Sequence, residues 1–231
     1  MNFQELSVAP ITHHQELNPA LWDDHQLRLE VRHRLLKIAK HFAEFLKVPD
    51  LRLKDITISG SNAGYNYSEF SDIDLHLVAD VDGREELYSA KKNQYNFTYD
   101  IKLNGVPVEL YVQDSKQLHH SAGIYSVLRN RWISEPSAAA PTVNPRDIKA
   151  KARNYAGQIN QALRSNDLSK CQETMEELYR LRKAGLEAGG ENSVENLAFK
   201  LLRARGQIGK LSKYITKLES AELSLGEHNE D

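Results

Sequence analysis

The chain has 231 residues and a net charge of −2 at pH 7, and 40% of its residues are hydrophobic, as is typical of a globular protein with one large domain or two small ones. No apolar run is long enough to span a bilayer, residues 1–10 lack the basic start and apolar core of a signal peptide, and the single cysteine, Cys171, excludes an intramolecular disulfide. We therefore expect a soluble protein of the reducing cytoplasm that has no membrane partner.

The first predicted element is an amphipathic helix. Asn18 followed by Pro19 is typical of a helix start, with the asparagine as N-cap and the proline at the first helical position. Apolar residues then recur every three or four positions as far as Phe45 and form one stripe. The pattern predicts a helix that ends near Lys47 and covers the back of a sheet.

Two strands are predicted next, at residues 51–59 and 72–79. Because successive side chains of a strand point to opposite faces, Asp72 and Asp74 share one face, and the isoleucine and leucines between and after them share the other. The apolar face can pack on a core. The acidic face carries two carboxylates one pleat apart, which repel each other unless a cation lies between them.

Carboxylates are the ligands that hard ions such as Mg²⁺ prefer, usually one or two of them together with substrate phosphates. His76 has the same strand parity as Asp72 and Asp74. Since Mg²⁺ prefers oxygen to nitrogen, we expect His76 to be a flanking surface residue and not a ligand.

A third carboxylate is expected on a hairpin that follows a predicted helix over residues 83–99. Asn104 and Gly105 form the strongest short hairpin signal, because both tolerate positive φ, and they predict a hairpin over residues 101–112. In its second arm, Glu109 has the parity of the polar face. If this arm pairs with the strand of Asp72 and Asp74, the three acids meet in one patch. A further hairpin is predicted around Asn130.

The C-terminal part is predicted to be a helical bundle. Residues 134–142, rich in alanine and proline, indicate a linker. Asn144 and Pro145 repeat the Asn-Pro helix start, and three apolar stripes follow. The third helix is capped by Ser193, and its apolar seam, with spacings of three and four, predicts one long helix as far as Leu218.

Charge is distributed unevenly between the two parts. Residues 144–218 contain 15 Lys and Arg against 8 Asp and Glu, whereas the rest of the chain contains 15 against 24. A basic half joined to an acidic half suggests that the two share an anionic substrate. The alternative is that helices are simply rich in Lys and Arg.

Together these motifs resemble the nucleotidyltransferase superfamily typified by DNA polymerase β. The resemblance depends on an apolar strand followed by Gly60 and Ser61, on the Asp-x-Asp of Asp72 and Asp74, and on Glu109 in a later strand. It covers roughly residues 51–112 and extends to the short stand-alone nucleotidyltransferases of phage genomes. Many members have aspartate where this chain has Glu109.

The resemblance implies a fold, a reaction and a site. It implies an α+β fold, with a small mixed or antiparallel sheet that has helices on one face, plus a C-terminal α-helical bundle. The implied reaction transfers a nucleoside monophosphate from an NTP, with ATP or CTP expected, to an acceptor hydroxyl and releases pyrophosphate. Two Mg²⁺ ions, with Mn²⁺ as an alternative, would be held by three acids that act as catalytic and metal-binding residues: Asp72, Asp74 and Glu109. The predicted nucleotide-binding residues are Gly60, Ser61, Asn62 and Lys151.

The predicted domains are a catalytic domain over residues 18–135, a basic bundle over residues 144–218 and an acidic flexible tail over residues 219–231. The bundle favours an RNA 3′ end, such as that of tRNA, as the acceptor. Two alternatives remain: a small-molecule acceptor, and a non-catalytic nucleotide- or protein-binding module. For the motif itself, the alternative is a chance loop beside surface carboxylates.

Overall fold

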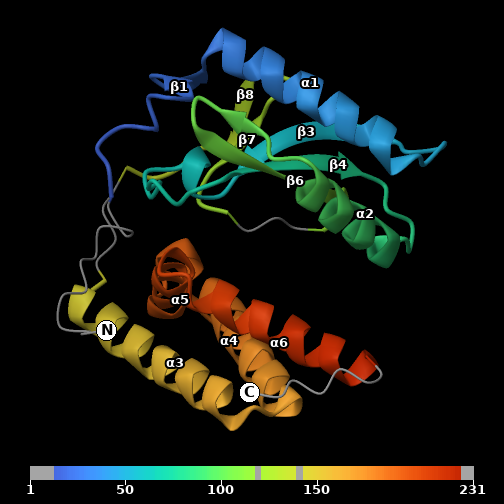
Figure 1. Cartoon of the computed structure of the whole chain (residues 1–231). Coiled ribbons are helices and arrows are strands. Elements are labelled where there is room, and N and C mark those ends of the chain that lie inside the picture. The colour runs from blue at the N-terminus through green and yellow to red at the C-terminus, as the bar shows by residue number, and fades with distance from the viewer. Residues whose placement is uncertain (1–12, 118–120, 139–142, 225–231) are drawn as a thin grey trace. The chain divides into compact units, whose positions relative to one another are not determined.

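The computed structural model describes residues 13–117, 121–138 and 143–224, which divide into two compact units, one within residues 12–140 and one within residues 141–231 (Figure 1). The first unit combines a sheet with helices, and the second is helical throughout its described elements. The predicted fold class, α+β with a C-terminal set of helices, is confirmed. Within the described residues, no helix is both long enough and apolar enough to cross a membrane.

A mixed six-stranded sheet forms the centre of the first unit. In spatial order its strands are β5 (Lys102–Leu103), β6 (Val106–Asp114), β4 (Ile73–Ala79), β3 (Leu53–Ser59), β7 (Ile124–Ser126) and β8 (Arg131–Ser134). β4 and β6 are parallel, whereas the other neighbours are antiparallel. Asn104 and Gly105 both have positive φ, as a tight Asn-Gly hairpin requires. The hairpins predicted around this pair and around Asn130 are confirmed.

The apolar face of the sheet packs against α1 (Leu29–Leu46), and α2 (Glu85–Thr98) runs beside β6 (Figure 1). The isoleucines and leucines of β3 and β4 lie in the same buried cluster as Phe42 of α1 and Tyr95 of α2. The Asn96 side chain exchanges two hydrogen bonds, each of 3.0 Å, with the backbone of Leu110. These bonds occupy the edge of β6 beyond its short pairing with β5, so this part of the edge is not open to another strand.

The opposite face of the sheet is polar because each strand alternates. β4 presents Asp74 and His76 on this face, and the parallel register places Glu109 beside Asp74 and Tyr111 beside His76. On the other side of β4, Ser59 is the antiparallel partner of Asp74. Rows of polar side chains therefore cross three strands.

The predicted helix start at Asn18 is wrong. Asn18 Oδ1 instead accepts a hydrogen bond from the backbone N–H of Ala20, and the chain continues into a two-stranded hairpin of β1 (Trp22–Asp23) and β2 (Gln26–Leu27) before α1 begins at Leu29. Asn18 Nδ2 also donates to Asn62 Oδ1 at 2.8 Å. An asparagine stabilises a turn by the same short side chain that caps a helix, and here the tertiary bond selects the turn.

Four α-helices form the described part of the second unit: α3 (Pro145–Ser165), α4 (Leu168–Gly189), α5 (Val194–Ala204) and α6 (Gln207–Leu223). Three of them begin at residues whose side chains accept a hydrogen bond from the first turn, Asn144, Asp167 and Ser193. Their apolar stripes share one buried cluster that includes Cys171, Leu178 and Leu211. The starts predicted at Asn144 and Ser193 are confirmed.

The prediction of one long third helix in the bundle is wrong, because two helices, α5 and α6, occupy that stretch. Gly206 lies between them with φ of 70°, and its N–H bonds the carbonyl of Arg203. A glycine with positive φ just past a helix end is a common stop signal. One continuous helix was predicted because the apolar spacing continues across this glycine. α6 continues to Leu223, beyond the predicted end at Leu218. Residues 139–142 of the predicted linker and residues 225–231 of the predicted tail lie outside the described residues.

Candidate metal centre

Asp72, Asp74 and Glu109 meet at one end of the polar face. Each offers a carboxylate oxygen, and these oxygens all lie within 4.8 Å of one another. Glu109 is the direct parallel partner of Asp74, and Asp72 immediately precedes β4. All three are partly buried, and they are the only such group of acidic, histidine or cysteine residues within the described chain. The predicted convergence is thus present in the structure, while the role of these residues as metal ligands stays a prediction.

The fit to a divalent ion follows from charge and donor type. Three carboxylates at this spacing repel one another, and removing them partly from water strengthens the repulsion. A hard cation among them offsets that cost and takes oxygen ligands. The donor set therefore suits Mg²⁺ or Mn²⁺ better than it suits a softer ion.

Gly60 provides the space for Asp74. It has φ of 74° and ψ of −162°, a region that is essentially restricted to glycine. A Cβ atom at this position would lie 2.0 Å from Asp74 Oδ2, far inside contact distance. The Gly60 N–H donates to Ser121 Oγ at 3.1 Å. The predicted role of Gly60 in nucleotide binding stays a prediction, and the structure shows a separate need for glycine at this position, the close approach of the Asp74 carboxylate.

Ser61 and Asn62 connect the turn after β3 to the start of β4. Ser61 Oγ donates to Ser71 Oγ at 2.9 Å, and Asn62 Nδ2 donates to the carbonyl of Asp72 at 2.8 Å. Both residues are buried. These bonds hold the side chain of Ser71 and the carbonyl group of Asp72, and so help to position Asp72. The predicted contacts of Ser61 and Asn62 with phosphate stay predictions.

Tyr111 and His76 form a second row beside the acids. Tyr111 donates a hydrogen bond from its hydroxyl to Glu109 Oε2 at 2.6 Å. Its ring stacks on His76 with centroids 5.0 Å apart, and Lys92 Nζ lies 4.5 Å from the ring centroid. Burial above all, and then the negative charges of Asp74 and Glu109, raise the pKa of Tyr111 far above its ordinary value of 10.0. Tyr111 therefore remains a hydrogen-bond donor at any physiological pH.

The expectation that His76 is a surface residue is wrong. It is 8% exposed, and its Nε2 lies 3.0 Å from Ser59 Oγ. Strand parity correctly placed His76 on the polar face, but burial of that face depends on neighbouring elements that a single strand pattern does not include. Tyr111 was missed as a site residue, although its position two residues after Glu109 placed it on the same face.

We expect Tyr111→Phe to lower the affinity of this site for Mg²⁺ about 10- to 100-fold, so that any activity there requires a correspondingly higher Mg²⁺ concentration. Loss of a partner that orients a metal ligand generally has this effect. The free energy of unfolding should fall by only about 1 kcal/mol, the usual contribution of one hydrogen bond. A Mg²⁺ titration of the activity and calorimetric Mn²⁺ binding measure the effect. Tyr99→Phe is the control, because Tyr99 packs on His41 outside the site. Equal ion affinities in the two variants would contradict the role of Tyr111.

Lys151 belongs to the helical unit, in which its ammonium pairs with Glu195 Oε1 at 2.9 Å. The hydrogen bond from Lys151 is the largest cause that lowers the pKa of Glu195, and the same bond raises the pKa of Lys151. In the described contacts Lys151 thus serves the packing of α3 on α5. Its predicted contact with the nucleotide stays a prediction.

The Lys151–Glu195 pair predicts a pH-dependent stability. Because the folded state lowers the pKa of Glu195 below its ordinary 4.5, the contribution is complete above pH 4.5 and is lost as the pH falls through the lower folded pKa. Since both side chains are about a third exposed, we expect the effect to be under about 1 kcal/mol. Denaturant unfolding of the wild type and Glu195→Gln should differ at pH 7 and converge as the pH falls below the lowered folded pKa of Glu195. A difference that persists at acid pH would contradict this origin.

The chain matches no model of a known protein family, and no curated protein is significantly similar to it in sequence. The resemblance to nucleotidyltransferases therefore depends on the residues of this site and on their order along the chain.

Proposed function

We propose that this protein is a metal-dependent nucleotidyltransferase that moves a nucleoside monophosphate from an NTP to an acceptor hydroxyl and releases pyrophosphate. One observation carries the proposal: three carboxylate oxygens lie within 4.8 Å of one another at the start of β4 and on the neighbouring β6, and the three residues follow the order of the Asp-x-Asp and later-acid motif along the chain. In a surface patch of acids that met by chance, no neighbouring position would have to be glycine. Here Asp74 approaches the backbone so closely that residue 60 has no room for a side chain, and the φ and ψ of that residue also favour glycine.

When bound, a pair of divalent ions would supply Lewis acidity, which lowers the pKa of the acceptor hydroxyl and offsets charge on the triphosphate. Asp72 and Asp74 would hold both ions, and Glu109, oriented by Tyr111, would hold the one nearer the acceptor. The protein has little covalent work in phosphoryl transfer, so its contribution is to position the reactants and to stabilise charge.

An RNA 3′ end is the acceptor that the charge distribution favours. Exposed basic residues follow one ridge of α6 at spacings of three and four: Lys210, Lys213 and Lys217. Arg203 and Arg205 add positive charge at the preceding turn. Such a ridge suits the phosphates of a nucleic acid. A small cationic acceptor fits this charge poorly. The single buried cysteine, Cys171, is consistent with a reducing cytoplasm as the proposed location.

Incubation with each of the four labelled NTPs, Mg²⁺ and total RNA tests the proposal. We expect label on RNA, pyrophosphate release, and loss of both in Asp72→Ala. Label on a small molecule instead of RNA would support the small-molecule alternative. NTP that binds and is recovered unchanged, with every acceptor unlabelled, would favour the non-catalytic module and reject the enzyme.

Salt dependence separates the RNA acceptor from the chemistry. If the α6 ridge contacts phosphates, the logarithm of RNA affinity should fall linearly with the logarithm of salt concentration, at about −0.7 per contacted phosphate for a single strand. Lys213→Gln should remove one phosphate contact and so reduce the magnitude of that slope by about 0.7. A slope near zero would reject the ridge as the RNA site and leave the metal centre untouched.

A further inference from the structure

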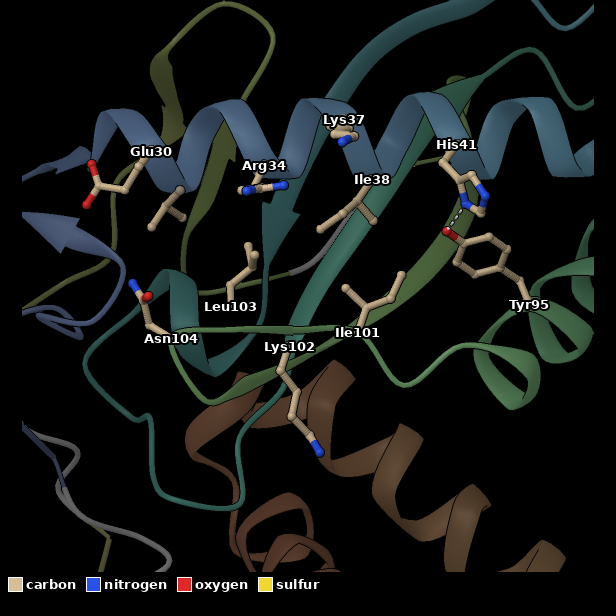
Figure 2. Close-up of a pocket in the computed structure, with 11 residues that line it drawn as sticks. Glu30, Arg34, Lys37, Ile38, His41, Tyr95, Ile101, Lys102, Leu103 and Asn104 are labelled. Carbon is tan, nitrogen blue, oxygen red and sulfur yellow. Dashed lines mark hydrogen bonds between the residues drawn. The ribbon is translucent and has the colours of Figure 1, made fainter.

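A pocket of about 580 Å³ lies on the helix-covered side of the first unit, between α1 and the hairpin arm that leads into β5 (Figure 2). The three acids belong to the opposite face of the sheet, because Leu103 pairs with Val106, which has the parity of the apolar face. The pocket is therefore separate from the candidate metal centre. Its volume falls within the range of roughly 300–1,000 Å³ that is usual for small-molecule sites.

The floor of the pocket is aliphatic. Val31 and Ile38 of α1 and Leu103 of β5 line it, each no more than 9% exposed, together with the half-buried Ile101. At one end the Tyr95 hydroxyl lies 2.7 Å from His41 Nδ1, so the polar groups at that end already bond each other. Figure 2 shows this pair at the opposite end of the pocket from Glu30. What remains available to a ligand along the floor is apolar surface.

The rim of the pocket is cationic. Arg34 and Lys37 are exposed on α1, three residues apart, and Lys102 is exposed on β5, where Asp100 pairs with it at 2.8 Å. Glu30 is the one acidic residue of the lining. On α1 the described ion pair joins Lys40 to Glu44, and no described ion pair includes Arg34 or Lys37.

We propose that this pocket binds a small anion with an aliphatic body, of the class of medium-chain carboxylates. An aliphatic floor favours an alkyl chain, because each buried methylene gains from removal from water. Arg34 and Lys37 at the rim supply the charge that a carboxylate head requires, and they leave that head in contact with solvent. A nucleotide fits less well, since a base gains most from a flat aromatic surface, and the one tyrosine of the lining, Tyr95, is fully buried.

Calorimetric titration of the full chain with sodium decanoate, below its micelle-forming concentration, tests the proposal. We expect saturable binding that is at least tenfold tighter than that of hexanoate, because four methylenes are added. Decanol should bind at least several-fold more weakly than decanoate, and added salt should reduce the difference between them. Amide chemical shifts should change at Ile38 and Leu103. Absence of saturable binding, or equal affinity for hexanoate and decanoate, would overturn the proposal.

The double substitution Arg34→Gln with Lys37→Gln should weaken decanoate binding at least tenfold. Lys40→Gln is the matched control, because Lys40 is an exposed cation on the same helix that pairs with Glu44 outside the pocket. All three side chains are exposed, so α1 should remain folded, which far-ultraviolet circular dichroism checks. Equal binding by the double variant and the control would overturn the assignment of the head group. Binding of ATP that requires Arg34 and Lys37, without binding of decanoate, would overturn the aliphatic class.

Discussion

Asp74→Asn should reduce nucleotide transfer on the order of 10³-fold while the protein remains folded. Asp74 lies close to both other acids: it is the partner of Glu109 across the parallel register, and it follows Asp72 by two residues along the chain. The substitution removes one negative charge and replaces one carboxylate oxygen by an N–H₂ group that repels a cation. A loss of several kcal/mol of charge stabilisation corresponds to a rate loss of this size. Transfer of label from NTP measures it.

The same substitution should have the opposite effect on stability without metal. Removal of one of three like charges relieves repulsion, so Asp74→Asn should raise the free energy of unfolding in EDTA by a few tenths to about 1 kcal/mol. Addition of Mg²⁺ should raise the melting temperature of the wild type and leave that of the variant unchanged, because only a folded state that binds the ion is stabilised by it. This measurement needs no acceptor and no NTP.

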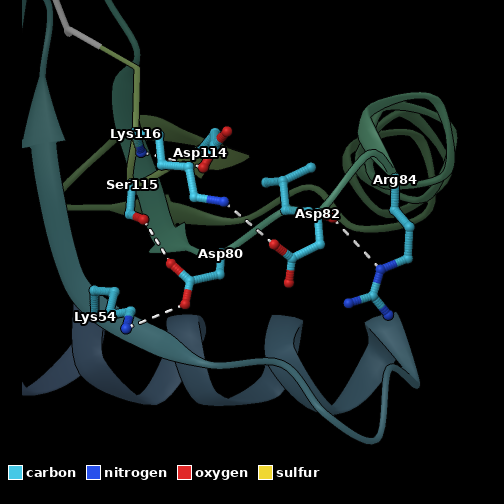
Figure 3. A network of polar contacts seen from close by, with 8 residues as sticks. Lys54, Asp80, Asp82, Arg84, Asp114, Ser115 and Lys116 are labelled. Atoms are coloured by element: carbon cyan, nitrogen blue, oxygen red, sulfur yellow. Dashed lines mark hydrogen bonds and ion pairs between the residues drawn. The ribbon is translucent and has the colours of Figure 1, made fainter.

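Asp80→Asn is the matched control. Asp80 directly follows the same strand, at the end away from the acids, and it interacts with Ser115 Oγ at 2.6 Å and Lys54 Nζ at 3.1 Å (Figure 3). Hydrogen bonds from Ser115 and Lys54 lower the pKa of Asp80, so this residue carries a full negative charge at neutral pH. Its substitution should leave transfer unchanged. Full activity in Asp74→Asn would remove the basis for the proposed enzyme.

The strand face on which each of the three acids lies was predictable because local rules determine it, whereas their meeting also required the pairing of β4 with β6, which the sequence left as a condition. Alternation places Asp72 and Asp74 on one face, and the Asn104–Gly105 turn determines which residues of the next arm share the face of Glu109. Neither rule needs knowledge of distant residues. The same holds for the helices that begin at Asn144 and Ser193, where a capping side chain bonds its own first turn.

Features that depend on distant contacts were not predictable from one sequence. Asn18 has the chemistry of a helix cap and of a turn, and its bond to Asn62, 44 residues away, selects the turn. His76 is buried by stacking on Tyr111 from another strand, which strand parity alone does not show. The break at Gly206 had a local signal, and the regular apolar spacing on both sides of it concealed that signal.

Gly60→Ala should reduce the rate of nucleotide transfer by more than its loss of folding stability alone would explain. The φ and ψ of Gly60 belong to a region that costs other residues about 1–3 kcal/mol, and the free energy of unfolding should fall by that amount. In addition, the new Cβ would lie 2.0 Å from Asp74 Oδ2, so the carboxylate must move, and misplacement by about 1 Å typically costs on the order of 10² in rate.

Gly83→Ala separates the two effects of that substitution. Gly83 has φ of 79°, close to that of Gly60, and a Cβ there would meet nothing within 4 Å. Gly83→Ala should therefore lose some stability through the positive φ of its backbone and keep its transfer activity and its Mg²⁺-induced rise in melting temperature. Gly60→Ala should lose both, at a temperature where each variant is folded. If the two alanine variants retained equal activity, the contact between Gly60 and Asp74 would have no part in catalysis, and Gly60 would be required only by the backbone of the turn.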